Sequence, residues 1–228
     1  LLLGYGGTGN TFLLQSGGTA TNVNAFVGFL STATGNAATV TGAGSIWTST
    51  GAFHLGYDGS FNTLTIANGG KVLVDGAAKD FLLGFNAGAD GNRVTVRGAG
   101  SELSNLNGTL YVGRSSMSNS LHIESGGLVT SKNVRIGGGT GSAGTNASGN
   151  VVYVDGAGSV WNISGTLRVG SGTATTSDGN VVEITGGGVV NVAGNSFLGY
   201  DANSDGNRVL VSGTGSHLNA HALTIGNV

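Results

Sequence analysis

Three acidic residues, Glu124, Asp155 and Glu183, fall in short apolar segments of consecutive sequence repeats, and Arg97 lies in the repeat before them. If the repeats stack as parallel strands, neighbouring positions lie about 4.8 Å apart. This register places Arg97, Glu124 and Asp155 in one outward column, with Glu183 offset by two residues. Two carboxylates held about 5 Å apart can act as acid and nucleophile in glycoside cleavage. The three acids are therefore the catalytic candidates, and the activity they would serve is that of a polysaccharide lyase or hydrolase.

A solvated surface is the simpler interpretation of this column. Arg97 can pair with Glu124, and the opposite outward strand offers only Tyr111, Arg135 and Arg168. The sequence shows no groove rich in basic side chains beside the acids. We therefore expect the chain not to be an enzyme.

A second candidate site is the segment Asp201, Asn203 and Asp205, which Gly206 follows. Alternating oxygen ligands before a glycine match the opening half of a calcium-binding loop of the EF-hand type. The twelfth position of such a loop would be Ser212 instead of glutamate, and Asp-Gly is also an ordinary turn. We expect no cofactor, with calcium as the alternative.

Aromatic residues form the third candidate site, because five of them directly follow a recurring glycine. Stacked in successive repeats, such rings would contact one another along the molecule. Two interpretations stay open: an internal or corner ladder that stabilises the stack, or an exposed stripe that binds sugar rings or a neighbouring chain, as in a carbohydrate-binding module. The five residues are Tyr5, Phe29, Tyr57, Phe85 and Tyr200.

A sequence motif, apolar-x-apolar-Gly, recurs every 24 to 33 residues and predicts the elements that would position these residues. Self-similarity at such a period indicates a solenoid, in which each repeat is one turn stacked on the next. The motif ends at Gly4, Gly28, Gly56, Gly84, Gly113, Gly137, Gly170, Gly199 and Gly226.

An asparagine fixes the phase of each repeat, because it stands between the recurring glycine and the next strand-like segment. Alternating aliphatic and β-branched residues follow it, bounded by Gly, Asn and Asp, which is typical of short strands. The pattern predicts an all-β chain: a right-handed parallel β-helix of about eight coils, each with three short strands, formed by residues 1–228 as a single segment. The asparagines are Asn10, Asn36, Asn62, Asn92, Asn119, Asn150, Asn180 and Asn207.

Two kinds of coil alternate along the chain. One has Gly-Gly at its second corner, as at Gly69-Gly70, and the other has Gly-x-Gly-Ser with an apolar residue two positions further on. Glycine at such corners permits a positive φ and close backbone stacking. We expect the apolar residues of the second kind to point inward on alternate coils. They are Trp47, Leu103, Trp161 and Leu218.

Composition narrows the class of protein. Glycine accounts for 46 of 228 residues, and both proline and cysteine are absent, which excludes disulfides and thiolate metal sites. Charged residues make up 9%, against roughly 25% in an ordinary soluble domain. With 9 basic and 11 acidic residues there is no basic patch for nucleic acid, and no transmembrane run occurs.

Specific phrases resemble the repeats of bacterial autotransporter passenger domains. They are Val154–Trp161 (VDGAGSVW), Gly165–Gly170 (GTLRVG), Leu64–Gly70 (LTIANGG) and Leu121–Gly127 (LHIESGG). The resemblance covers essentially the whole chain. It implies an extracellular or cell-surface β-helix that is translocated through an outer-membrane barrel and acts as a stalk or adhesin.

The two ends of the sequence begin and finish inside the repeat, at Leu1–Gly4 and Leu223–Gly226. We therefore expect a fragment of a longer chain. An open end of a β-helix exposes core side chains and strand edges. The partners we expect are further coils of the same chain or another copy stacked end to end in a filament, and surface glycans are a further candidate.

Overall fold

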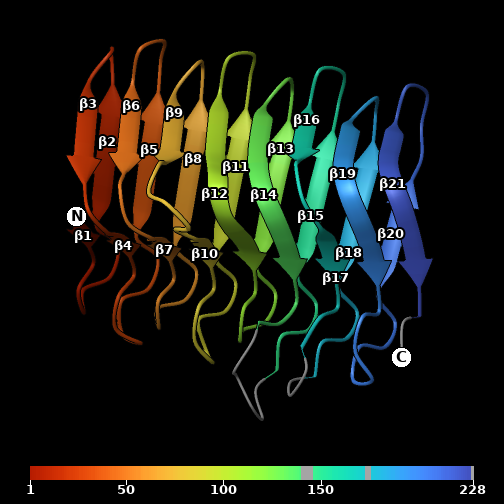
Figure 1. Cartoon of the computed structure of the whole chain (residues 1–228). Helices are drawn as coiled ribbons and strands as arrows, with labels where there is room; N and C mark the ends of the chain where they lie inside the picture. Colours follow the sequence, from red (N-terminus) through yellow and green to blue (C-terminus); the bar gives the residue numbers. More distant parts are fainter. Residues whose placement is uncertain (140–145, 173–175, 227–228) are drawn as a thin grey trace.

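The chain winds into a β-solenoid of eight coils, with every strand paired in parallel to the equivalent strand of the next coil (Figure 1). This computed structural model describes residues 1–139, 146–172 and 176–226. Within those ranges the chain contains strands, turns and bends but no helix. The expected all-β parallel β-helix is confirmed, and at about 4.8 Å per coil the stack is about 40 Å long.

The first strand of each coil follows the phasing asparagine, and these strands form one eight-stranded sheet. Their bounds are β2 (Thr11–Gln15), β5 (Ala37–Thr41), β8 (Thr63–Ala67), β11 (Arg93–Arg97), β13 (Ser120–Glu124), β15 (Val151–Asp155), β18 (Val181–Thr185) and β20 (Arg208–Val211).

The second and third strands form the other two sides of the coil. Second strands are β3 (Thr19–Asn22), β6 (Ile46–Ser49), β9 (Lys71–Val74) and β16 (Val160–Ile163). Third strands, which carry the apolar-x-apolar motif, are β1 (Leu2–Leu3), β4 (Ala25–Val27), β7 (Phe53–Leu55), β10 (Phe81–Leu83) and β17 (Leu167–Val169).

In four coils the second and third strands run on as one long strand, which differs from the expected three short strands. These are β12 (Glu102–Val112), β14 (Leu128–Ile136), β19 (Val189–Leu198) and β21 (His217–Ile225). The strand pairing continues across the corner, with a register shift between Asn105 and Thr109 and another between Val192 and Asn195. A register shift of this kind lets the strand bend at the corner, as a β-bulge does, so that the second and third strands are continuous without a separate loop.

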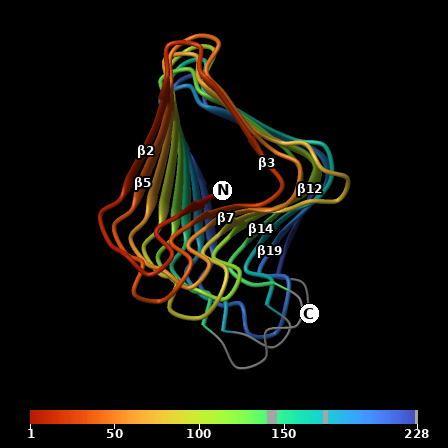
Figure 2. The ribbon, with the colours of Figure 1, turned by 90° about the vertical axis from the view of Figure 1, so that its left-hand side faces the viewer.

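Loop length varies most at the corner between the third strand and the next first strand (Figure 2). It also varies between the second and third strands, where residues 23–24 join β3 to β4 and residues 75–80 join β9 to β10. The coils nearly coincide at the upper corner and diverge at the lower one, where the segments between each recurring glycine and the next asparagine project. A rigid stack tolerates insertions where backbone groups can reach solvent.

The core is a stack of alternating inward side chains. Trp47, Leu103 and Trp161 have no solvent exposure, which confirms the expected register. Leu218, in the last coil, is half-buried and packs against the same core. Ring contacts continue along the axis, with Phe53 stacked on Phe81 at 5.0 Å between centroids.

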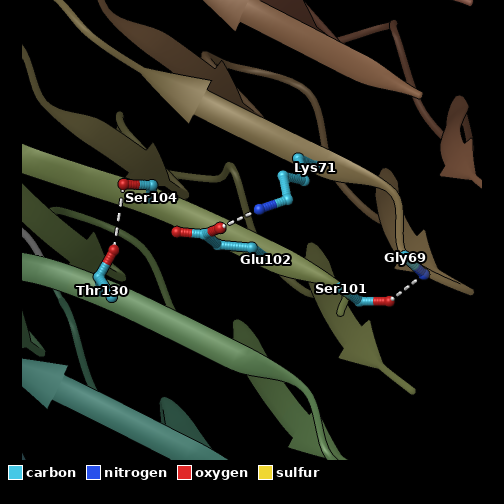
Figure 3. Close-up of polar contacts among 6 residues, drawn as sticks. All are labelled: Gly69, Lys71, Ser101, Glu102, Ser104 and Thr130. Atoms are coloured by element: carbon cyan, nitrogen blue, oxygen red, sulfur yellow. Dashed lines mark hydrogen bonds and ion pairs between the residues drawn. The ribbon is translucent and has the colours of Figure 1, made fainter. Parts of the chain in front are cut away.

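At the upper corner, a hydrogen bond joins each Gly-Gly coil to the Gly-x-Gly-Ser coil that follows it. Ser101, from a Gly-x-Gly-Ser coil, accepts the N–H of Gly69 in the preceding Gly-Gly coil at 3.0 Å (Figure 3). Its Oγ also donates to the Arg97 carbonyl at 2.7 Å. Gly69 has φ +85°, which residues with a Cβ rarely adopt. The same contact joins three other pairs: Gly17 to Ser45, Gly126 to Ser159 and Gly187 to Ser216.

The phasing asparagines form a continuous ladder at the lower corner, and we call this set the asparagine ladder. Each one except the last, Asn207, donates its backbone N–H to the Oδ1 of the asparagine in the next coil, with N···Oδ1 distances of 2.8–3.0 Å. Its Nδ2 donates to the same Oδ1 at 2.9–3.3 Å. The six central members are completely buried. Gly56, with φ +76°, leaves room for this packing, because a Cβ there would come within 2.2 Å of Asn92 Nδ2.

Candidate functional site

The acidic column lies on the outward face of the first strands. Register pairs Arg97 with Glu124 and Glu124 with Asp155, as expected. Glu183 stands in the neighbouring column, because its register partner is Tyr153. The structure therefore brings together Glu124 and Asp155, and it sets Glu183 apart.

The side chains of these acids are used in surface contacts. Asp155 Oδ1 accepts a hydrogen bond from Thr185 Oγ1 at 2.6 Å. Glu183 forms an ion pair with Arg208 at 2.8 Å. The hollow beside the column is lined by Glu124 but by neither of the other two acids. This hollow therefore does not hold two of these carboxylates. The expectation that the chain is not an enzyme stays a prediction.

The expected ion pair between Arg97 and Glu124 is wrong for this structure. In the described part of the chain the ion pairs are Lys71–Glu102, drawn in Figure 3, and Arg208–Glu183. Exposed ion pairs typically contribute about 1 kcal/mol or less. Neighbouring positions in register therefore do not force two long charged side chains together.

The segment of Asp201, Asn203 and Asp205 is built into the stack by its backbone. The Asn203 carbonyl accepts the N–H of Ser177 at 2.9 Å, and the Asp205 N–H donates to Asp178 Oδ1 at 2.8 Å. Among the described residues, no group of three or more His, Asp or Glu side chains could hold a metal ion. These contacts are those of a turn stacked on the preceding coil.

Asp201 faces cations of its own chain. Burial raises the pKa of its carboxyl, and Arg168 and Arg135 oppose that rise. The calcium alternative stays untested.

The aromatic residues form a stacked row on the outside of the lower corner. We call Tyr5, Phe29, Tyr57 and Phe85 the aromatic ladder. Their ring centroids are 5.5, 5.0 and 4.9 Å apart in turn, with interplanar angles of 13–24°. The faces of the inner rings are therefore occupied by neighbouring rings, and their edges are the parts left to solvent.

The aromatic ladder covers the outward residues of the third strands. Phe26 and His54 lie beneath it and stack on each other at 4.8 Å. His54 meets Tyr57 and Phe85 edge-on at 5.2 and 5.1 Å. His54 is 8% exposed, and burial, followed by the charge of Arg114, lowers its pKa to about 4. These contacts favour the stabilising interpretation of the aromatic series.

Two arginines stack on rings of the aromatic series, and one of them, Arg114, occupies the position after the recurring glycine Gly113. The Arg114 guanidinium lies over the Phe85 ring at 4.6 Å, and that of Arg168 lies over Tyr200 at 3.9 Å. The sequence interpretation missed these contacts, because it considered only the aromatic residues that follow the recurring glycines. Arginine is planar and stacks on aromatic faces, which is the signal that could have found them.

An outward row of amides also escaped the sequence interpretation. Asn219 donates to Asn191, and Asn191 donates to Asn162, each at 2.8 Å. They line a hollow of about 360 Å³ whose other walls include Leu106, 57% exposed, and Ile163. Asparagine at one outward position in three successive coils is the sequence signal for such a row.

Comparison with protein-family models, curated proteins and solved structures found no match for this chain. Within the described residues, no helix is long and apolar enough to cross a membrane.

Proposed function

We propose that this chain is a segment of an extracellular structural repeat protein, a stalk, fibre or adhesin of the autotransporter passenger type on a bacterial surface. The observation that carries the proposal is the uninterrupted axial stack. The core and the asparagine ladder join each coil to the next, and the aromatic ladder adds contacts from Tyr5 to Phe85. Such a rod supplies length and stiffness, which are the properties that a surface spacer needs.

The chemistry of the surface supports the same role. Only 9% of the residues are charged, and none is cysteine. The chain therefore has no thiol that could form a disulfide in the oxidising environment outside the cell. The most variable loops gather at the lower corner, where insertions leave the stack intact. In a surface fibre these loops are the part that can diversify.

The end coils support self-association or continuation as the partner. Leu1 and Leu2 are 38% and 46% exposed at one end, and Leu223 and Ile225 are 47% and 70% exposed at the other. Fully burying an aliphatic side chain stabilises by about 1.5–3 kcal/mol. Further coils or a second copy docked head to tail would cover these side chains, and the second arrangement builds a filament.

Surface exposure on the cell that encodes the chain is the direct test. Antibodies raised against residues 1–228 should label intact cells, and protease added outside should remove the label. A cytoplasmic enzyme of the same cells serves as the control and should stay unlabelled and undigested. Detection of the chain only after cell lysis would refute the proposed location.

Light scattering on the purified chain tests the self-association. We expect concentration-dependent growth that Ile225→Lys suppresses, because a charge on the end face opposes docking. Leu210→Lys is the matched control, since Leu210 lies on the side of the same coil and is 36% exposed. A monomer at all concentrations would contradict docking between copies.

A further inference from the structure

Two arginines on one strand lack a carboxylate partner. Arg93 and Arg97 are exposed at the two ends of β11, with Thr95 between them, while Val94 and Val96 point into the core. Neither arginine takes part in the ion pairs found in the described part of the chain. In a chain with 9 basic residues, two arginines on one strand with no ion-pair partner are a local concentration of positive charge, which exceeds that of the one nearby carboxylate, Glu124.

These side chains line a hollow of about 320 Å³, which we call the arginine–threonine hollow. Strand register places Thr63 beside Arg93 and Thr65 beside Thr95, on the preceding coil. Glu124 closes the far side, next to Arg97. Neighbouring coils are about 4.8 Å apart, so Thr65 and Thr95 lie side by side in the column between the two arginines, and Thr63 lies beside Arg93.

The mixture of groups specifies a ligand with two kinds of polar group. Guanidinium is planar and binds carboxylate in a bidentate manner. Threonine hydroxyls and the Glu124 carboxylate accept hydrogen bonds from hydroxyl groups. A simple anion would be repelled by Glu124, and a neutral sugar would leave both guanidiniums without a counter-charge.

We propose that the arginine–threonine hollow binds a uronic acid residue of an acidic polysaccharide. The sugar carboxylate lies between Arg93 and Arg97, and its hydroxyls meet the threonines and Glu124. This goes beyond the proposed stalk function and does not depend on it.

The neighbouring coils limit the charge density of that polysaccharide. His122 and Tyr153 continue the middle column, with ring centroids 4.8 Å apart. Burial, and then the charge of Arg93, lowers the pKa of His122, so that its imidazole is neutral at pH 7. Asp155 lies next to Glu124 one coil further on. A polymer with an acid on every sugar would meet these carboxylates, whereas one with acids separated by neutral sugars would not.

Calorimetric titration with three oligosaccharides of equal length tests the proposal. A hyaluronan tetrasaccharide, in which acidic and neutral sugars alternate, should bind. Neutral chitotetraose and a densely sulfated heparin tetrasaccharide should bind more weakly. Equal or tighter binding of either of these, or no hyaluronan binding at millimolar concentration, would overturn the assignment.

Variants locate the binding site. Arg93→Gln and Arg97→Gln should each weaken hyaluronan binding about tenfold or more, since a hydrogen bond to a charged group contributes about 1.5–3 kcal/mol. Arg208→Gln is the matched control: Arg208 occupies the same outward column as Arg93 in the last coil but is paired with Glu183. It should change the affinity less than about twofold.

Two further variants separate charge from geometry. Arg97→Lys keeps the charge but loses the bidentate fork, and Thr95→Val removes the central hydroxyl while keeping a β-branched side chain. Both should weaken binding with unchanged far-ultraviolet circular dichroism. If all four changes in the hollow leave the affinity within about twofold of that of the unaltered chain, the hollow is not the binding site.

Discussion

Removing one rung of the asparagine ladder should destabilise the coils on both sides of it. Asn92 is completely buried. Its Oδ1 accepts the N–H of Asn62 at 2.8 Å and the Nδ2 of Asn62 at 3.0 Å. Its own Nδ2 donates to the carbonyls of Ala89 and Gly59 at 2.8 and 3.1 Å. The same Nδ2 also donates to Asn119 Oδ1 at 3.3 Å. Asn92→Ala deletes all five contacts and leaves the site inaccessible to solvent.

The size of the effect follows from the groups left unpaired. A buried donor or acceptor without a partner costs about 1–3 kcal/mol. The two donors of Asn62 alone therefore give a loss of about 2–6 kcal/mol. The Asn92 backbone N–H still reaches Asn119 Oδ1, so the loss is concentrated on the side of Asn62 and the Ala89 turn.

Native-state amide hydrogen exchange is the suitable assay, because a stack of coils opens locally and the loss is local. The amide of Asn62 should exchange about thirtyfold faster or more in Asn92→Ala, the equivalent of 2 kcal/mol. Asn107→Ala is the control, since Asn107 is exposed in β12. An acceleration at Asn62 below about threefold, or one matched by the control, would refute the reasoning.

Five further substitutions test the core, the buried histidine and the acidic column. Trp161→Ala should cost about 3–5 kcal/mol in urea unfolding, because the indole is fully buried. Between pH 6.5 and about 4 the unfolded chain binds more protons than the folded chain at His54, so stability should fall by about 3 kcal/mol as the pH drops through that range. His54→Leu should remove this loss, and an unchanged pH profile of thermal unfolding would contradict it. Asn105→Val should raise the unfolding free energy by about 1–3 kcal/mol, because both amide atoms of this buried side chain lack hydrogen-bond partners. Valine should fit there, since Val74 precedes Asn105 in the stack. A drop in stability would show that the amide of Asn105 is hydrogen-bonded. Glu124→Gln and Asp155→Asn should leave the melting temperature unchanged, and a polysaccharide panel should show no release of reducing or unsaturated ends with or without them.

The register of the fold could be predicted from the sequence because each coil repeats the same positions. The recurring glycines and asparagines set the coil length, and alternation then decides which residues face inward, as Trp47 and Leu103 do. A shift of one residue would turn every apolar side chain outward, so this feature is strongly determined.

The surface contacts could not be predicted with the same certainty, because they depend on small free energies. Register brings Arg97 next to Glu124, yet no ion pair joins them, while Arg114, which is not part of the aromatic series, stacks on Phe85. Each of these contacts is worth on the order of 1 kcal/mol. The merging of second and third strands into β12 depends on how the corner residues bend, which the periodic pattern does not encode.

The asparagine ladder also gives the rod a direction. Every rung donates toward the C-terminal side and accepts from the N-terminal side, from Asn10 through to Asn207. One face of the stack thus carries the acceptor Oδ1 of Asn10, and the other carries the N–H donor of Asn207. Addition in the same orientation would extend the row, whereas two copies meeting by identical faces would oppose acceptor to acceptor. Copies that associate through these end faces would therefore all point in the same direction, and the two tips of the assembly would be chemically distinct.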